Sequence, residues 1–224
     1  MKNRLIVFVF ISALLVSFSA NAAEMKKSGF LSDYSGMKKG AKGSAEWVYI
    51  KEGIDFTKYK KLMVDQVTFF LKDDAKYKGI QPEDIKELTE AFDKAARENI
   101  GKYYELTDQP GPDVVRIRVA ITDLVPGKPG MSAMSTVMPI GLGLSIVKKA
   151  VTGKHTGVGE TSMEMEVVDS LTNERFAAAI DEYSGGKLSG LTKWGSAEEA
   201  FKFWTERIRK RLDEYKEKKR EDKQ

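Results

Sequence analysis

The sequence predicts an α+β fold, a two-layer sandwich in which two long amphipathic helices and a shorter connecting helix pack against a sheet. Two observations predict this. Apolar residues recur at three- and four-residue spacing over residues 82–100 and 196–215, as on one face of a helix. Between these segments, apolar and polar residues alternate, as in strands with one buried face. We expect four to five strands in a mostly antiparallel or mixed sheet, enough for one core between two layers.

The N-terminal residues predict export. Lys2 and Arg4 precede an uncharged apolar run over residues 5–18, and Ala-Asn-Ala at residues 20–22 fits a cleavage site. We therefore interpret residues 1–22 as a secretory signal peptide and expect a soluble periplasmic protein. The chain contains no cysteine, so we expect no disulfide, no lipid anchor on a cysteine and no thiolate catalysis.

An arm and the first strands are predicted next. Residues 23–45 are polar, contain glycine and show no sustained period, which indicates an extended arm. Phe30, Leu31 and Tyr34 are expected to hold this arm against the domain. β-branched and aromatic residues then predict the first two strands, at residues 46–50 and 61–71.

The first helix is predicted from Pro82 to Ile100. Glu83 and Asp84 favour its first turn, and Gly101 favours its end. A face that packs on the sheet is expected from the residues at helical spacing, which are Ile85, Leu88, Phe92, Ala95 and Ile100.

Two later segments show the alternation of strands most clearly. Residues 113–124 alternate valine and isoleucine with Arg116 and Arg118, and another segment alternates methionine and valine with Glu164 and Glu166. Each strand is expected to bury its apolar face and to expose its charged face to solvent. Opposite charges that face each other on neighbouring strands contribute about 0.2–1 kcal/mol per pair, and we expect these arginines and glutamates to pair in that way.

A hairpin is predicted from strands at residues 161–169 and 174–182. The connecting sequence DSLTNE is rich in residues that favour turns. In the second strand, Phe176, Ala178 and Ile180 are expected to share one face.

The last helix is predicted to begin at Ser196, which stands three residues before Glu199 as in a capping box. We expect one domain over residues 46–216 and a charged C-terminal tail over residues 217–224. The buried stripe of the last helix is expected to contain Ala200, Phe201, Trp204, Ile208, Leu212 and Tyr215.

An apolar segment lies between the two long alternating strands, because residues 129–147 carry no charge. Prolines and glycines interrupt it, which disfavours a transmembrane span, and a connecting helix from Pro139 to Gly153 is expected instead. Its apolar residues cannot all face one core, so we expect an exposed patch that contacts a partner or a second copy. The candidate patch residues are Met131, Met134, Val137, Met138, Leu142 and Ile146.

Several catalytic chemistries are disfavoured. His155 is the only histidine, so a catalytic triad or a metal site has a single imidazole available. TGKHT lacks the first glycine and the Ser/Thr of a phosphate loop, and GLGLSI lacks the third glycine of a dinucleotide fingerprint. A carboxylate-dependent hydrolase remains an alternative, although solvated sheet-face charges are the simpler interpretation of Asp123, Glu164, Glu166, Asp169 and Asp181.

Charge disfavours a nucleic-acid partner. The chain has 37 basic and 33 acidic residues, and without Lys2 and Arg4 the balance is 35 against 33, a net of +2. Within that, residues 207–224 hold nine basic and five acidic residues. A mixed balance of this size is typical of solvated helix surfaces.

Four phrases resemble a bacterial family of unknown function, numbered 3313: SGFLSDYSGM at residue 28, VRIRVAITDLVPGKP at 115, VMPIGLGLSIVKKAVTGKHTGVGETSMEMEVVDSLTNERFAAAIDEYSGGK at 137 and WGSAEEAFKFWTERIRKRL at 194. The resemblance implies an exported single-domain protein and supplies no catalytic residues. Many members are described as lipoproteins, whereas this chain lacks the cysteine that such an anchor needs.

These observations together predict a non-enzymatic exported protein of the cell envelope that binds or scaffolds an unknown envelope partner or associates with itself. A peripheral membrane protein that uses residues 131–151 is the alternative, followed by the hydrolase. No catalytic residue, cofactor or metal ligand is predicted.

Overall fold

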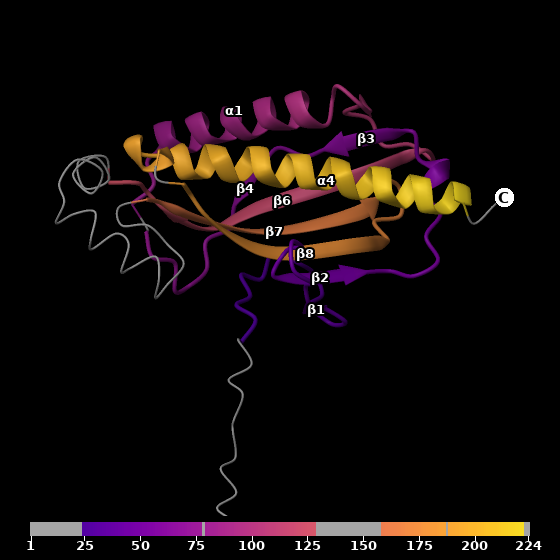
Figure 1. Cartoon of the computed structure of the whole chain (residues 1–224), viewed down its shortest axis with the longest axis horizontal. Helices are drawn as coiled ribbons and strands as arrows, with labels where there is room; N and C mark the ends of the chain where they lie inside the picture. The colour runs from indigo at the N-terminus through magenta and orange to yellow at the C-terminus, as the bar shows by residue number, and fades with distance from the viewer. Residues whose placement is uncertain (1–23, 78, 129–157, 187, 222–224) are drawn as a thin grey trace, which may run out of the picture.

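The computed structural model describes residues 24–77, 79–128, 158–186 and 188–221, which form a sheet with two long helices on one face (Figure 1). The strands are β1 (Lys38–Lys39), β2 (Trp47–Ile50), β3 (Lys61–Val64), β4 (Thr68–Phe69), β5 (Glu105–Leu106), β6 (Val114–Val125), β7 (Glu160–Asp169) and β8 (Arg175–Ser184). The helices are η1 (Phe56–Lys58), α1 (Pro82–Asn99), η2 (Ser189–Leu191) and α4 (Gly195–Glu221), of which η1 and η2 are short 3-10 helices.

The sheet is mixed, and its strands follow the order β1-β2-β8-β7-β6-β3-β5, with β4 paired to β6. The predicted α+β class is confirmed, but the described residues form eight strands rather than four or five. Five of them, β1 to β5, are only two to four residues long. Such short strands carry too few alternating positions to stand out in the sequence.

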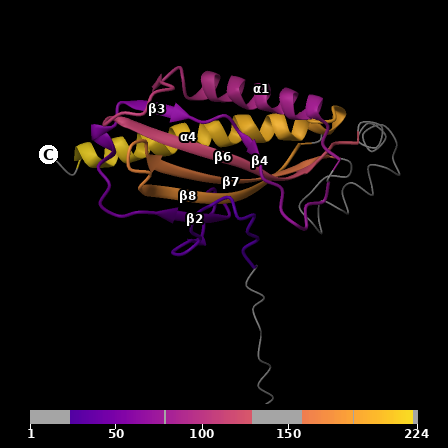
Figure 2. The same cartoon turned by 180° about the vertical axis from the view of Figure 1, so that it is seen from behind.

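Both long helices lie on the same face of the sheet, as Figures 1 and 2 show from opposite sides. The predicted packing of the helices through Phe92 and Trp204 is confirmed, since these side chains are 3% and 1% exposed. Phe92 also meets Phe201 of α4 edge to face, with ring centroids 5.5 Å apart. The two helices and the sheet therefore enclose one core.

The sheet's centre is antiparallel: β7 pairs with β6 on one side and with β8 on the other. The facing pair Arg118 and Glu166 is confirmed, both in register and as an ion pair. Arg116 instead faces Val168 and pairs with Asp65 from the β3–β4 connection. The single strand predicted over residues 61–71 is wrong, because it is interrupted after Val64 and divides into β3 and β4, which both pair with β6.

Helix α1 has nearly the predicted bounds, with Gln81 and Asp84 forming a capping box around the predicted start at Pro82. The prediction that Ile85 belongs to the buried face is wrong, since Ile85 is 39% exposed. Asp84 is buried in its place, where it accepts hydrogen bonds from Lys193 and from the Trp194 indole. A carboxylate that serves as a cap and an ion-pair partner thus replaces an apolar contact.

Helix α4 begins at Gly195 and continues to Glu221, beyond the end predicted at residue 215. The predicted capping box is wrong, because the Glu199 carboxylate accepts from the backbone of Gly186 at 3.0 Å, while Ser196 lies against Ser189. The helix start is therefore held by the preceding loop.

A β-bulge in β8 overturns the predicted face of the hairpin's second strand. The ladder pairs Val168 with Arg175 but Val167 with Ala177, which leaves Phe176 as the extra residue. Two residues at a bulge oppose one on the partner strand, so Phe176 packs in the core beneath the helices. Ala178 and Ile180 pack on the opposite face with Leu31.

The arm's predicted contacts are confirmed for its apolar residues: Leu31 is buried, and Phe30 and Tyr34 pack around it on the face without helices. The predicted signal peptide, the connecting helix at 139–153, the candidate patch and His155 lie outside the described residues. Within the described part of the chain, none of the helices is long and apolar enough to cross a membrane.

Candidate functional site

An apolar cavity of about 210 Å³ lies between α4 and the sheet, on the side of β2. Its lining comes from four strands, two helices and the loop before β2. The lining residues are Ser44, Ala45, Val48, Tyr49, Ile50, Phe56, Ile117, Met163, Met165, Val167, Ala177, Ala178, Ala179, Trp204, Arg207, Ile208, Arg211, Leu212 and Tyr215.

The position of the cavity follows from the size of the helices. A helix with its side chains is about 10–12 Å across and neighbouring strands are about 4.8 Å apart. Two helices side by side therefore cover about four strands, whereas the sheet path contains seven. Helix α4 packs on β7 and β8, so the next strand, β2, extends past it.

Small side chains on β8 leave the space open. Ala177 and Ala179 lie on the face toward α4 and pair with Ile50 and Val48 of β2. Alanine is depleted in strands because it packs little surface, and here two alanines stand where a larger side chain would fill the volume. Ile50 of β2 lies beyond the residues that pair with β1 and is 48% exposed, which marks the cavity's mouth.

The inner wall is rigid and apolar. Trp204 and Ile208 of α4 are 1% and 8% exposed, and they cover Ile117 and Met163 of the central strands. The Trp204 indole nitrogen donates a hydrogen bond to Asp181 at 2.9 Å, which fixes the orientation of the ring. An apolar space of this size that few polar groups border is typical of a small-molecule pocket.

Two arginines on α4 are the charged residues of the lining. Arg207 forms an ion pair with Asp181, and both side chains are largely buried. Arg211 donates to the Ser44 hydroxyl at 2.8 Å and pairs with Glu214 at the surface. Positive charge therefore stands at the mouth, while the interior carries none.

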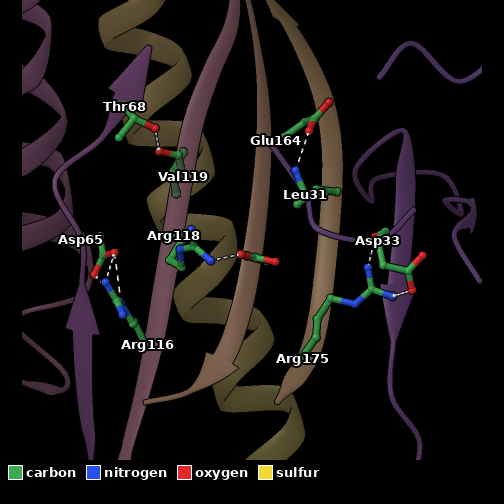
Figure 3. A network of polar contacts seen from close by, with 10 residues as sticks. Leu31, Asp33, Asp65, Thr68, Arg116, Arg118, Val119, Glu164 and Arg175 are labelled. Carbon is green, nitrogen blue, oxygen red and sulfur yellow. Dashed lines mark hydrogen bonds and ion pairs between the residues drawn. The ribbon is translucent and has the colours of Figure 1, made fainter. Parts of the chain in front are cut away.

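A different arrangement occupies the opposite face of the sheet, where Figure 3 shows charged side chains paired beneath the arm. Glu164 is 0% exposed. Its carboxylate accepts hydrogen bonds from the backbone nitrogens of Ser28 and Leu31 at 2.6 and 3.3 Å and from the Tyr34 hydroxyl at 2.6 Å. Burial, together with this hydrogen bond, raises the pKa of Tyr34.

The arginines of this face hold further carboxylates. Arg116 binds Asp65 through two nitrogens at 2.8–3.1 Å, and Arg175 donates to the Asp33 carboxylate of the arm at 3.1 Å (Figure 3). A hydrogen bond from Ser35 holds the pKa of Asp33 below its ordinary value. The arm is thus fixed by polar contacts at two points.

The prediction that these sheet carboxylates are solvated is wrong. Glu164 and Glu166 are buried beneath the arm, whereas Asp181 is buried on the helix side. Asp169 lies at the β7–β8 turn, where two backbone amides and the Tyr59 hydroxyl bind it, and these contacts lower its pKa to about 2. Asp123 accepts from the backbone of Lys76 and from its own neighbour, Leu124.

The structure therefore does not bring the five carboxylates together. Asp181 of β8 pairs with Met163 of β7, and Met163 points to the face opposite that of its neighbour Glu164. The sheet therefore separates Asp181 from Glu164 and Glu166. In the described ranges, no group of three or more acidic or histidine side chains is placed to hold a metal ion. The donor pattern around each carboxylate is that of a structural anchor.

Sequence reasoning missed the cavity. The signal that could have found it is the alanine run at residues 177–179, since three alanines inside a strong strand provide little packing volume. The buried glutamates also had a signal, because Phe30 and Leu31 are large apolar residues in an otherwise polar arm. The candidate patch at residues 131–146 lies outside the described residues.

Together, the fold and the cavity define an α+β protein with an apolar pocket under α4. The sequence model of a family described as "Protein of unknown function (DUF3313)" matches residues 26–208, and the chain belongs to this family. The resemblance stated from the sequence is thereby confirmed. No curated protein matches the chain.

Among solved structures, the chain is similar to a PelC dodecamer from Paraburkholderia phytofirmans, with 11% identity over 69% of this chain and 92% of that one, and a TM-score of 0.38. A DUF330 family protein from Xanthomonas campestris shares 10% identity over 66% of this chain and 81% of its own, with a TM-score of 0.36. TM-scores below 0.5 mark a distant likeness, from which no function follows.

Proposed function

We propose that the protein is a non-enzymatic binding module of the cell envelope, and that the cavity under α4 holds an apolar ligand. The observation that carries the proposal is the cavity itself, which lies against buried core residues such as Trp204 and Met163 and is open to the surface beside β2. The predicted signal peptide at residues 1–22 supports an envelope location.

The size of the cavity favours a ligand over a packing defect. An engineered cavity of roughly 150 Å³ in another protein holds a benzene molecule, and this cavity of about 210 Å³ is larger. Filling apolar space with an apolar ligand removes surface from water, at roughly 25 cal/mol per Å². The cavity therefore gives a ligand a favourable site without any catalytic group.

The placement of the carboxylates favours binding over hydrolysis. Glycoside hydrolysis needs two carboxyl groups that flank one bond, at about 5–10 Å from each other on the same side of a site. Here the apolar cavity contains no carboxylate in its lining, and the buried glutamates bind the arm on the other face.

An uncharged fluorescent probe tests the function. N-phenyl-1-naphthylamine should bind the mature protein at one site with a rise in fluorescence, and Ala177→Leu should abolish that rise because leucine fills the cavity. Leu188→Ser is the matched control, since it removes an apolar side chain that is 76% exposed and lies outside the cavity. Equal binding by all three proteins would show that the probe binds elsewhere and would overturn the proposal.

A contact of residues 131–147 with a partner or a second copy stays a prediction, and membrane-surface contact is its alternative. Its support is the uncharged sequence between Lys128 and Lys148. Light scattering and liposome flotation should differ between the mature protein and a Met138→Asp/Leu142→Asp variant. A folded variant with unchanged oligomeric state and lipid binding would contradict it.

A further inference from the structure

The mouth of the cavity carries information about its ligand. Among the lining residues, the charged ones are Arg207 and Arg211, and both are positive. They stand four residues apart on α4, so they project from the same side of the helix. An apolar interior that ends at cationic side chains is complementary to a molecule with an apolar chain and an anionic end.

The two arginines are not equally available. Arg207 is committed to Asp181, with side chains 16% and 10% exposed, and its guanidinium lies 4.8 Å from the centre of the Phe203 ring. Removing either partner of a buried pair leaves an uncompensated charge, which is strongly unfavourable. Arg207 therefore helps to hold α4 on the sheet and does not serve as a free cation.

Arg211 is held only at the surface. Its side chain is 49% exposed and its partner Glu214 is 59% exposed. Exposed ion pairs of this kind contribute about 0–1 kcal/mol, so a second anion can replace Glu214 at little cost. The other Arg211 nitrogen donates to the Ser44 hydroxyl, which can in turn donate its own hydrogen to an anion at the mouth.

The acidic groups around the mouth do not oppose an anion. Asp181 is neutralised by Arg207, Glu46 pairs with Lys39, and Glu214 pairs with Arg211. Each of these carboxylates already has a cationic partner, so the mouth carries no excess of negative charge that would repel an anion.

The width of the interior limits the apolar part. Ala177 and Ala179 on the sheet and Ile208 on the helix border a volume of about 210 Å³, which suits part of one alkyl chain. The rest of a longer chain can leave past Ile50, which is already exposed. Two chains side by side, as in a diacyl lipid, exceed this volume.

We infer that the ligand is a single-chain anionic amphiphile: its alkyl chain lies under α4 against Ala177, and its anionic head group binds Arg211 and Ser44. The inference rests on the proposed function, since it names the ligand class of that same cavity. A carboxylate and a phosphate monoester share this chemistry, and the experiment separates them.

Displacement of N-phenyl-1-naphthylamine tests the head group. Dodecanoate, dodecyl phosphate, dodecanol and dodecyltrimethylammonium are compared below their micelle concentrations, so that chain length is constant and only the head differs. We expect at least one of the two anions to displace the probe at about tenfold lower concentration than the alcohol or the cation, because a hydrogen bond to a charged group is worth about one factor of ten or more. The more effective anion identifies the head group as a carboxylate or a phosphate.

Variants locate the head group. Arg211→Gln should weaken binding of the preferred anion by about tenfold and leave binding of dodecanol unchanged. Arg211→Lys should retain part of the preference for the anion because it keeps the charge. Lys210→Gln is the matched control: it removes the same charge from the neighbouring position, which is exposed and outside the lining. Added salt should weaken binding of the anion but not binding of the alcohol.

Failure of this inference is distinguishable from failure of the proposed function. Equal displacement by all four amphiphiles, a preference for the cation, or an anion preference that survives in folded Arg211→Gln would overturn the head-group assignment while the cavity still binds the probe. Failure of the probe to bind the unmodified protein would overturn the proposed function itself. Circular dichroism and thermal melting establish that each variant is folded.

Discussion

The two faces of the sheet are both covered, but by different means. On one face, α1 and α4 bury large apolar side chains such as Phe92, Phe201 and Trp204. On the other, a short N-terminal arm is held by hydrogen bonds to Glu164 and by the pair of Asp33 with Arg175 (Figure 3). The helix face contains an apolar cavity, whereas the arm face combines a small apolar cluster around Leu31 with paired charges.

This difference shows that a layer of helices and an extended arm leave different structures on the face of the sheet that they cover. A helix covers a fixed width of the sheet. Strand β2 lies beyond the width that α4 covers, so an apolar pocket forms beside α4. An extended arm has free backbone nitrogens that a sheet must satisfy, so a buried carboxylate suits it better than an apolar side chain. The helix face leaves an apolar space beside α4, and the arm face holds the segment over residues 28–34.

The largest expected effect comes from the helix face. Trp204→Ala should lower the free energy of unfolding by about 3–5 kcal/mol, because it removes a fully buried aromatic ring and its hydrogen bond to Asp181. Urea denaturation measures this. Phe203→Ala is the control, since Phe203 belongs to the same helix and is 42% exposed. Similar losses in both variants would mean that α4 does not pack as described.

On the arm face, Glu164→Ala should cost about 2–3 kcal/mol, because hydrogen bonds to a charged group are strong and three donors lose their acceptor. Glu164→Gln keeps an acceptor oxygen and should cost less. The arm should become the first site of proteolysis in the alanine variant, which limited digestion with mass spectrometry detects. An arm that stays protected would show that Leu31 and Phe30 hold it without the carboxylate.

The same contrast explains which parts of the structure could be predicted. The helix face was predictable because helical spacing and alternation report burial of apolar residues, and Phe92, Trp204 and the strands around Ile117 lie where those patterns place them. The arm face was not, since alternation cannot distinguish a polar residue in solvent from one buried under another segment, as Glu164 is. The bulge at Phe176 also inverted a face, because one extra residue shifts every later side chain.

The cavity was outside the reach of pattern reasoning for a different reason. A pattern shows which residues are apolar, but a void depends on how far the helices extend across the sheet. Ala177 and Ala179 gave the only local signal. These alanines indicate a cavity only if the sheet extends past the helices. The sequence pattern could not show that extension, because strands β1 and β2 are too short to be recognised with their full pairing.

Acid should lower the stability of the turn that joins β7 and β8, where Asp169 lies. The pKa of Asp169 is lowered to about 2 from an ordinary value of 3.8, first by its hydrogen bond from the Thr172 backbone. The ionised carboxylate therefore stabilises the fold by about 2 kcal/mol above pH 4, and this contribution is lost as the pH falls from about 4 to 2. Asp169→Asn should be less stable than the parent at pH 6 and should show a flatter loss of stability below pH 4.

Tyr59→Phe sharpens this prediction. It removes one donor to Asp169 while keeping the ring, so the Asp169 pKa should rise and the acid-induced loss should begin at higher pH. Thermal melts at intervals from pH 6 to pH 2 provide the comparison. Parallel curves for the parent and both variants would show that Asp169 does not govern the acid response.

The smallest expected effect compares the two faces at adjacent residues of β8. Both residues line the cavity, but Ala177 packs against the core on the helix side, whereas Ala178 is 2% exposed and packs with Leu31 under the arm. The same substitution should therefore have opposite signs. Ala177→Val should stabilise the ligand-free protein by about 0.5–2 kcal/mol by filling space, while Ala178→Val should destabilise it by about 1–3 kcal/mol by overpacking a filled site. The two variants carry the same substitution at neighbouring positions of one strand, and strand preference itself reflects how the side chain packs on its face. The difference between them therefore compares the packing of the two faces, and urea denaturation of both without ligand measures it. Loss of stability in both variants would mean that the cavity closes in solution, and a gain in both would mean that the arm packs loosely on β8.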